Sequence, residues 1–80
     1  MHKLRIDLRL YPTKRLLLQF LATQITDLFG LNYDALIDAL TSYKEPFIIE
    51  LQNISSFENQ KELLEIFEII QTQNNNIQIH

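Results

Sequence analysis

The sequence predicts an α/β fold of two layers, in which three or four helices pack on a three-stranded parallel sheet. The first observation is the period of the apolar residues, which distinguishes strands from helices. The strands are expected at residues 3–9, 47–51 and 77–79. The helices are expected at residues 13–27, 33–42 and 60–73. The second observation is their order, β-α-α-β-α-β, which favours parallel strands joined by right-handed crossovers. The third is the length of 80 residues, which suits a single domain over residues 1–80.

The first strand and the first helix follow from a change in the apolar period. From Lys3 to Arg9 apolar and charged residues alternate, which is typical of a half-buried strand. Pro12 stops the alternation, and Thr13 is suited to cap a helix. Apolar residues then recur at helical spacing, so this helix is expected to run from about Thr13 to Asp27. Gly30, the only glycine in the chain, is expected to form its left-handed C-terminal cap.

The remaining elements each have a local signal. Asn32 is suited to cap the second helix. The run Phe47–Leu51 is apolar and rich in branched residues, which predicts a buried strand. Residues 53–59 are polar and predict a loop before the third helix, whose apolar face is wide. Asn74–Asn76 predicts a turn before the last strand.

The composition indicates a folded, soluble protein. Hydrophobic residues make up 46% of the chain, and there is no cysteine, which fits a reducing cytosol. Charged residues interrupt the apolar residues near the N-terminus, so we expect no secretory signal. The apolar runs are too short to span a bilayer. We therefore expect a cytoplasmic protein that does not bind membranes and is monomeric when free.

The charges are divided unevenly along the chain. Residues 1–15 hold five basic residues and one acid, a net charge of +4, whereas residues 16–80 hold nine acids and two basic residues, a net charge of −7. An acidic body repels phosphate backbones, so direct binding of nucleic acid is not expected. It attracts basic partners, and nucleases are commonly basic. Acidic helices are also simply soluble, so charge alone leaves both interpretations open.

The residues that catalysis requires are largely missing. There is no cysteine nucleophile, no glycine-rich phosphate loop and no His-Glu-x-x-His motif. The two histidines, His2 and His80, lie near the ends of the chain, where an active-site geometry is hard to hold. Carboxylates alone, without EF-hand spacing, do not predict a metal site. We expect no enzyme activity, no cofactor and no metal.

One pair of carboxylates stands out in the second helix. Asp34 and Asp38 are four residues apart, so they lie on one face of that helix. Like charges at this spacing are mildly destabilising, and an anion at Asp38, towards the helix C-terminus, opposes the helix dipole. Asp38 is thus a candidate for partner binding, while a solvated face with no partner is the alternative.

Helical geometry separates two faces of this segment when residues are placed at steps of about 100°. An apolar stripe suited to the core contains Leu36, Ala39, Leu40 and Tyr43. The opposite face contains Asp34, Asp38 and Thr41. Tyr33 and Ile37 fall between the two, either as the edge of the core or as apolar surface beside the acids. Apolar residues flanked by carboxylates are typical of an interface for a basic partner.

The segment Phe29-Gly30-Leu31-Asn32-Tyr33-Asp34-Ala35-Leu36-Ile37-Asp38-Ala39-Leu40-Thr41 resembles the loop and second helix of barstar-type ribonuclease inhibitors. The resemblance continues less closely to Leu51. It implies the barstar-like fold with its parallel sheet. It also implies that the chain binds and occludes the active site of a small basic ribonuclease in a 1:1 complex, as an antitoxin or immunity protein. The carboxylate of Asp38 would then take the place of a substrate phosphate, and Asp34 would be a second acidic contact.

The resemblance implies a contact surface made by the loop and the second helix. Its expected members are Leu28, Gly30, Asn32, Tyr33, Asp34, Ile37, Asp38, Thr41, Ser42, Tyr43 and Glu45. The family's best-known member has tryptophan at the positions of Ile37 and Tyr43. It has a glutamate at the position of Ile69, so that acidic contact is missing here unless Glu65 or Glu68 replaces it.

Two other functions remain open at this stage. A barstar-like module could dock on another basic protein without inhibiting it, and the identity of the bound protein separates this from inhibition. A hydrolase that uses Asp34 and Asp38 requires a cleft, which two carboxylates on one exposed helical face rarely form.

Overall fold

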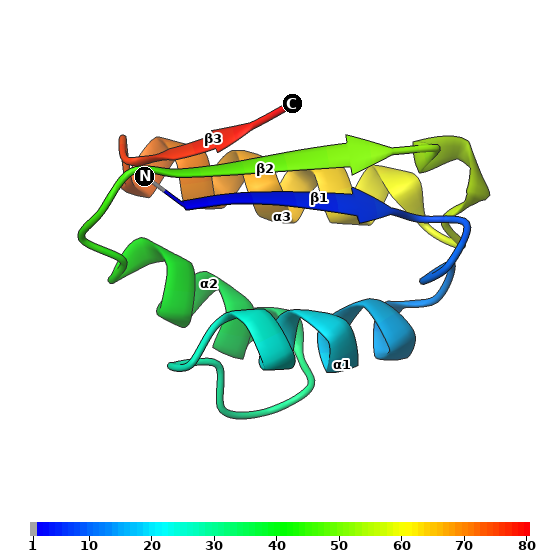
Figure 1. The fold of residues 1–80 in the computed structure, drawn as a ribbon, viewed down its shortest axis with the longest axis horizontal. Coiled ribbons are helices and arrows are strands. Elements are labelled where there is room, and N and C mark those ends of the chain that lie inside the picture. The colour runs from blue at the N-terminus through cyan, green and yellow to red at the C-terminus, as the bar shows by residue number, and fades with distance from the viewer. Residues whose placement is uncertain (1) are drawn as a thin grey trace.

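The computed structural model describes residues 2–80 and contains one three-stranded sheet and three α-helices (Figure 1). The strands are β1 (His2–Asp7), β2 (Phe47–Gln52) and β3 (Ile77–Ile79). The helices are α1 (Lys14–Gln24), α2 (Tyr33–Thr41) and α3 (Gln60–Gln73), and a short 3-10 turn, η1, spans Ile54–Ser56. The predicted order of strands and helices is confirmed.

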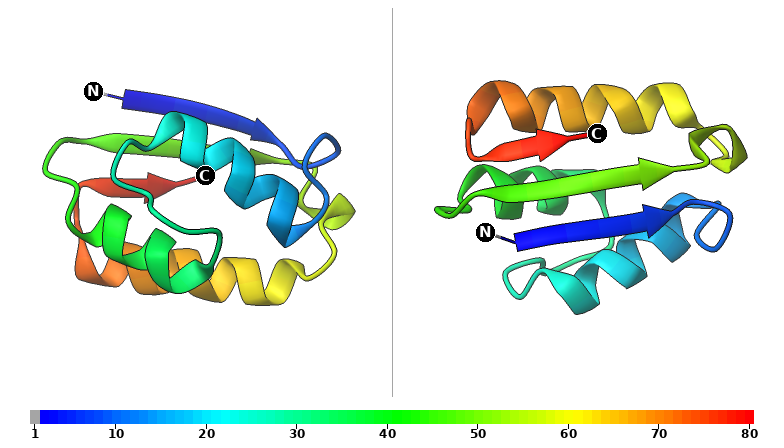
Figure 2. Two further views of the ribbon diagram at one scale, coloured as in Figure 1. Left: turned by 90° about the horizontal axis from the view of Figure 1, so that it is seen from below. Right: turned by 45° about the horizontal axis from the view of Figure 1, so that its top comes forward.

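The sheet has the order β1-β2-β3, and both pairs of strands are parallel. β1 pairs with β2 from His2 beside Phe47 to Asp7 beside Gln52. All three helices lie on one face of the sheet, so the fold has two layers (Figure 2). The predicted α/β class with a parallel sheet is therefore confirmed.

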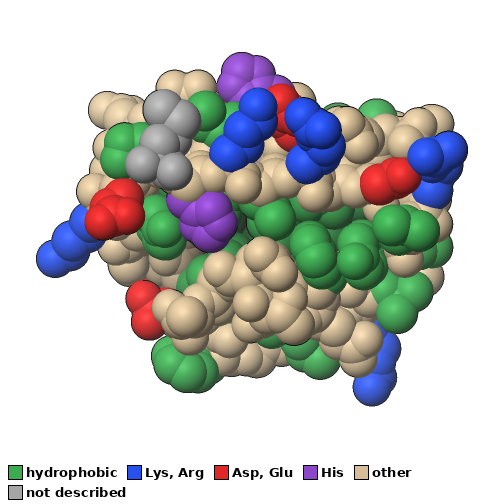
Figure 3. Space-filling model, in the orientation of Figure 1, with side chains coloured by type: hydrophobic (Ala, Val, Ile, Leu, Met, Phe, Trp, Pro, Cys, Tyr) green, Lys and Arg blue, Asp and Glu red, His purple; other side chains and the backbone are tan. Residues whose placement is uncertain are grey.

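The core lies between the sheet and the helices. Alternate strand residues, such as Leu4, Ile6 and Ile49, are buried against apolar residues of all three helices. On the other face of the sheet, Glu50 accepts a hydrogen bond from Nε of Arg5 at 2.9 Å and lies 3.2 Å from Nζ of Lys3. The bond from Arg5 lowers the pKa of Glu50. Lys and Arg side chains lie over this face of the sheet in Figure 3.

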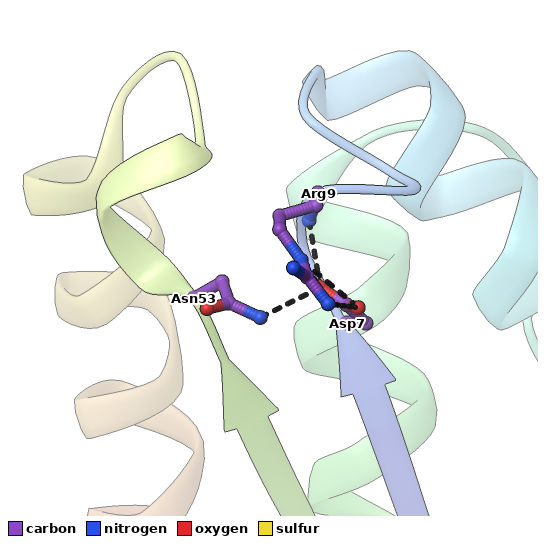
Figure 4. A network of polar contacts seen from close by, with 3 residues as sticks. All are labelled: Asp7, Arg9 and Asn53. Carbon is purple, nitrogen blue, oxygen red and sulfur yellow. Dashed lines mark hydrogen bonds and ion pairs between the residues drawn. The ribbon is translucent and has the colours of Figure 1, made fainter.

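The first strand ends two residues before its predicted end at Arg9. The chain turns there because Asp7 holds Arg9: the Asp7 carboxylate accepts bonds from the Arg9 backbone N–H at 3.0 Å and from its guanidinium at 2.8 Å. Asn53, which has φ 58° after β2, donates to the same carboxylate at 2.9 Å (Figure 4). These bonds, chiefly those from Arg9, hold the pKa of Asp7 far below its ordinary value. The network joins the ends of β1 and β2.

The predicted end of the first helix, at Asp27, is wrong. α1 begins as predicted, with Thr13 as its N-cap, but ends at Gln24 with Ile25 in an extended conformation. Ile25 and Leu28 continue the apolar pattern and are buried in the core, although they lie in the loop after α1. The prediction that Gly30 forms the C-cap of this helix is also wrong, although Gly30 does have a positive φ of 120°. None of the helices in residues 2–80 has the length and hydropathy that a membrane span requires.

Candidate functional site

The helix α2 is fixed at both ends by asparagine side chains. At its start, Oδ1 of Asn32 accepts a hydrogen bond from the backbone N–H of Ala35 at 2.7 Å, which confirms the predicted N-cap. At its end, Nδ2 of Asn74 donates to the carbonyl oxygens of Leu40 at 2.8 Å and Tyr43 at 2.7 Å. Asn74 is the one buried polar residue in the described core. Carbonyls at a helix end lack partners within the helix, so the Asn74 amide adds a donor for the last turn of α2 and for the residue after its C-cap.

One face of α2 belongs to the core, as the helical geometry predicts. Leu36, Ala39 and Leu40 are buried, and Tyr43 is half-buried with its ring 5.1 Å from that of Phe47. These contacts hold the helix against the sheet and α3, so the opposite face is presented on a rigid support.

The opposite face presents the two carboxylates. Asp34 and Asp38 are exposed, and within residues 2–80 neither side chain forms an ion pair or accepts a hydrogen bond. Thr41 is half-buried, and its hydroxyl donates to the backbone carbonyl of Asp38 at 3.3 Å. The acidic pair is thus available to a cation that another molecule supplies.

Tyr33 and Ile37, which the sequence left between core and surface, differ in exposure. Tyr33 is 6% exposed and belongs to the core, with Nζ of Lys14 4.6 Å from its ring centroid. Its hydroxyl is buried without a hydrogen-bond partner in the described structure, and burial, with Glu62 and Glu58 nearby, raises its pKa to about 12. Ile37 is half-buried at the margin of the core. Of the two, Ile37 has the side chain that another protein can reach.

The loop between α1 and α2 holds the first expected contact residues. Leu28 is buried, so its side chain belongs to the core and is not part of the surface. Gly30 is exposed, and a Cβ on it would lie 3.3 Å from Nδ2 of Asn32 and 3.7 Å from Cβ of Ala35. The loop therefore folds closely over the first turn of α2.

The remaining expected contacts follow the end of α2. Ser42 and Glu45 are exposed, and the Ser42 N–H bonds to the Asp38 carbonyl at 3.3 Å. The Tyr43 hydroxyl lies 3.4 Å from Nδ1 of His2, whose ring stacks on Phe47. With the loop and α2, these residues form one continuous stretch of chain.

Ile69 stands where the family's best-known member has a glutamate. It lies on α3, which packs beside α2. Ile69 is exposed and borders a shallow hollow of about 450 Å³. Glu65 and Glu68 line the same hollow. Two carboxylates thus flank the apolar side chain: Glu65 lies four residues before Ile69, and Glu68 lies directly before it.

Three residues of this region were not singled out from the sequence. Phe29 and Leu31, on either side of Gly30, are strongly exposed apolar side chains, and Asn74 supports α2 from a distant turn. The only signal for the first two was their place beside the glycine. Within residues 2–80, no cluster of three or more His, Cys, Asp or Glu residues is arranged to hold a metal ion.

Comparison with known families identifies the chain as a whole. A family model described as Barstar (barnase inhibitor) matches residues 1–79. The chain belongs to the barstar family. The family match confirms the resemblance drawn from residues 29–41 and the barstar-like fold. Comparison with curated proteins found no similar sequence.

Membership of the barstar family also indicates a function at the level of the family. Members are inhibitors of barnase-type ribonucleases rather than enzymes, so the partner implied for this chain is a ribonuclease like barnase.

Proposed function

We propose that this barstar-family protein blocks a small basic ribonuclease by covering its active site with α2 and the loop before it. The observation that carries the proposal is the exposure of Asp34 and Asp38 without a paired cation. Both carboxylates are exposed on a helix fixed at both ends, and neither is neutralised by a cation within residues 2–80. Unpaired acids on a rigid support match an enzyme surface built to bind phosphates.

Asp38 has the central role in this proposal. It takes the place of a substrate phosphate and faces the basic residues of the enzyme, while Asp34 adds a second acidic contact. Ile37, Thr41, Ser42, Tyr43 and Glu45 form the rest of the surface, and one chain fills one active site. We place this inhibition inside the producing cell, where the inhibitor acts as an antitoxin or immunity protein.

The test is inhibition of a panel of small basic ribonucleases that includes barnase. The wild-type chain is expected to inhibit at least one member, with an association rate that falls as salt is added. Asp38→Ala is expected to weaken binding by about 100-fold or more, because truncating a buried charge partner at an interface costs several kcal/mol. Folding should be unchanged or slightly improved, since the dipole disfavours an anion there.

The control is Glu50→Gln, which removes one negative charge that pairs with Lys3 and Arg5 on β1, outside the loop and α2, and should bind like the wild type. Equal inhibition by wild type and Asp38→Ala would show that the phosphate-mimic role is wrong. Binding without inhibition would favour a non-inhibitory interaction module. Inhibition of no panel member would overturn the proposal.

A further inference from the structure

His2, at the start of β1, packs on the stretch of chain that ends the proposed contact surface. Its Nδ1 lies 3.4 Å from the hydroxyl of Tyr43, 41 positions later in the chain, and its ring stacks on that of Phe47 with the centroids 4.3 Å apart. Its backbone N–H donates to the carbonyl oxygen of Pro46 at 3.0 Å. These three contacts fix the imidazole beside a residue that the proposed function assigns to the interface.

Phe47 gives His2 and Tyr43 a common support. Phe47 is fully buried, His2 stacks on its ring at an interplanar angle of 19°, and Tyr43 meets the same ring edge-on at 61°. His2 and Tyr43 are both half-buried, so each keeps part of its surface for solvent or for a partner. A protein that covers Tyr43 consequently lies next to the imidazole.

Histidine is the residue whose charge ordinarily changes between about pH 5 and 8. Within residues 2–80, no carboxylate forms an ion pair with the His2 ring, and Lys3, the next residue, lies 3.2 Å from Glu50 instead. The segment that packs on His2 holds three titratable residues: Tyr43, Lys44 and Glu45. Tyrosine, lysine and glutamate ordinarily keep one charge state from about pH 5.5 to 8. In this part of the surface, therefore, His2 is the group whose protonation changes the charge.

We infer that His2 makes inhibition of the target ribonuclease depend on pH, with tighter binding when the imidazole is neutral. This inference rests on the proposed function, because it requires Tyr43 to face a basic enzyme. A protonated imidazole beside Tyr43 adds a positive charge near the basic residues of the enzyme, which offsets part of the attraction of the acidic face. Binding should consequently tighten as the pH rises from about 5.5 to about 8.

The test measures the dissociation constant at about pH 5.5 and about pH 8 for a ribonuclease that the wild-type chain inhibits. The ratio of the two constants is expected to be about two- to fivefold larger for the wild type than for His2→Gln, which is polar and carries no charge. Comparing ratios for one enzyme cancels the titration of the enzyme's own groups. The matched control is His80→Gln, since His80 follows β3, at the opposite edge of the sheet from β1, and its loss should leave the wild-type ratio unchanged.

His2→Lys separates the charge from the packing of the imidazole, because lysine is positive at both pH values. At about pH 8 this variant is expected to bind about two- to fivefold more weakly than His2→Gln, and added salt should narrow the gap. A merely structural role of the imidazole would weaken both variants alike and leave the pH ratio as in the wild type. Either of those results would overturn the inference.

The wild type alone provides a measurement that does not depend on how the variants fold. NMR titration of the His2 ring, free and in the complex, gives the pH at which the ring is half protonated. Because the coupling between proton and enzyme is reciprocal, that pH should be lower in the complex. An unchanged or higher value would show that the charge of His2 does not oppose binding.

The outcomes separate this inference from the proposed function. Loss of binding in Asp38→Ala, together with equal pH ratios in the wild type and His2→Gln, overturns the role of His2 alone. Inhibition of no ribonuclease by the wild type overturns both.

Discussion

The side chain of Asn74 donates a hydrogen bond to the backbone carbonyl of Leu40 at 2.8 Å, which joins the turn after α3 to the last turn of α2. A second bond to the Tyr43 carbonyl, at 2.7 Å, uses the other amide hydrogen, and Oδ1 accepts from the N–H of Asn76. Because Asn74 is buried, removing its amide would take the side-chain donor from both carbonyls, and only Leu40 would keep another donor, the Tyr43 N–H at 3.2 Å.

We therefore expect Asn74→Ala to lower the free energy of unfolding by about 1–3 kcal/mol. Urea denaturation followed by circular dichroism measures the change. Asn75→Ala, at the exposed neighbouring position, should change stability by less than about 0.5 kcal/mol. Equal effects in the two variants would mean that the turn as a whole matters and the Asn74 amide does not.

Gly30 should tolerate no L side chain without loss of stability. Gly30→Ala places a Cβ 3.3 Å from Nδ2 of Asn32 in a backbone conformation with positive φ. Strain of about 1–2 kcal/mol is expected, measured as a lower unfolding free energy. A synthetic chain with D-alanine at position 30 is the control, since a D-residue favours positive φ. If D-alanine destabilises as much as L-alanine, the positive φ of Gly30 is not the cause of the loss.

Tyr33→Phe should be neutral or stabilising by up to about 1 kcal/mol at neutral pH, because it removes a buried hydroxyl without a partner. The pKa of Tyr33 is raised from 10.0 to about 12 in the folded chain. Its neutral form is favoured by folding, so this contribution is fully present below pH 10.0 and is lost as the pH rises towards 12. Between pH 10 and pH 12 the free energy of unfolding should therefore fall more for the wild type than for Tyr33→Phe, as measured by denaturation at each pH. Equal falls in the two proteins would contradict the raised pKa.

Asp7 should make the fold sensitive to acid. Arg9 and Asn53 hold the pKa of Asp7 well below 3.8, so its ionised form is favoured by folding. That contribution is present above pH 3.8 and is lost as the pH falls towards the lowered value. Asp7→Asn should therefore lose less stability than the wild type on acidification to about pH 2, measured by denaturant midpoints. Glu50, whose pKa is also lowered, adds a loss of the same sign to both proteins and cancels in their difference.

The regular elements could be predicted because their signals are local. Asn32 caps α2, α3 spans Gln60–Gln73 and β3 spans Ile77–Ile79, as expected from capping chemistry and apolar period. The core stripe of α2 was likewise predictable, since its spacing alone distinguishes the buried face from the acidic one.

The errors arose where burial and regular structure differ. Ile25 and Leu28 continue a helical pattern and are buried, yet they lie in a loop, so periodicity extended α1 too far. Asn74 was expected only to form a turn, because its role depends on carbonyls brought to it by tertiary structure. The exposure of Phe29 also depends on the path of the loop, which no local pattern specifies.

The bond from Asn74 to Leu40 has a consequence for synthesis on the ribosome. The two residues are separated by 34 positions, and β1 cannot pair until β2, about 40 residues later, has emerged. Such distant contacts delay folding until most of a domain is available. A nascent chain that already displays Asp34 and Asp38 would still lack the amide that fixes the end of α2. Inhibition of a ribonuclease is therefore expected only once synthesis of the inhibitor chain is nearly complete. A cell that makes both proteins would then need to begin translating the inhibitor before the enzyme.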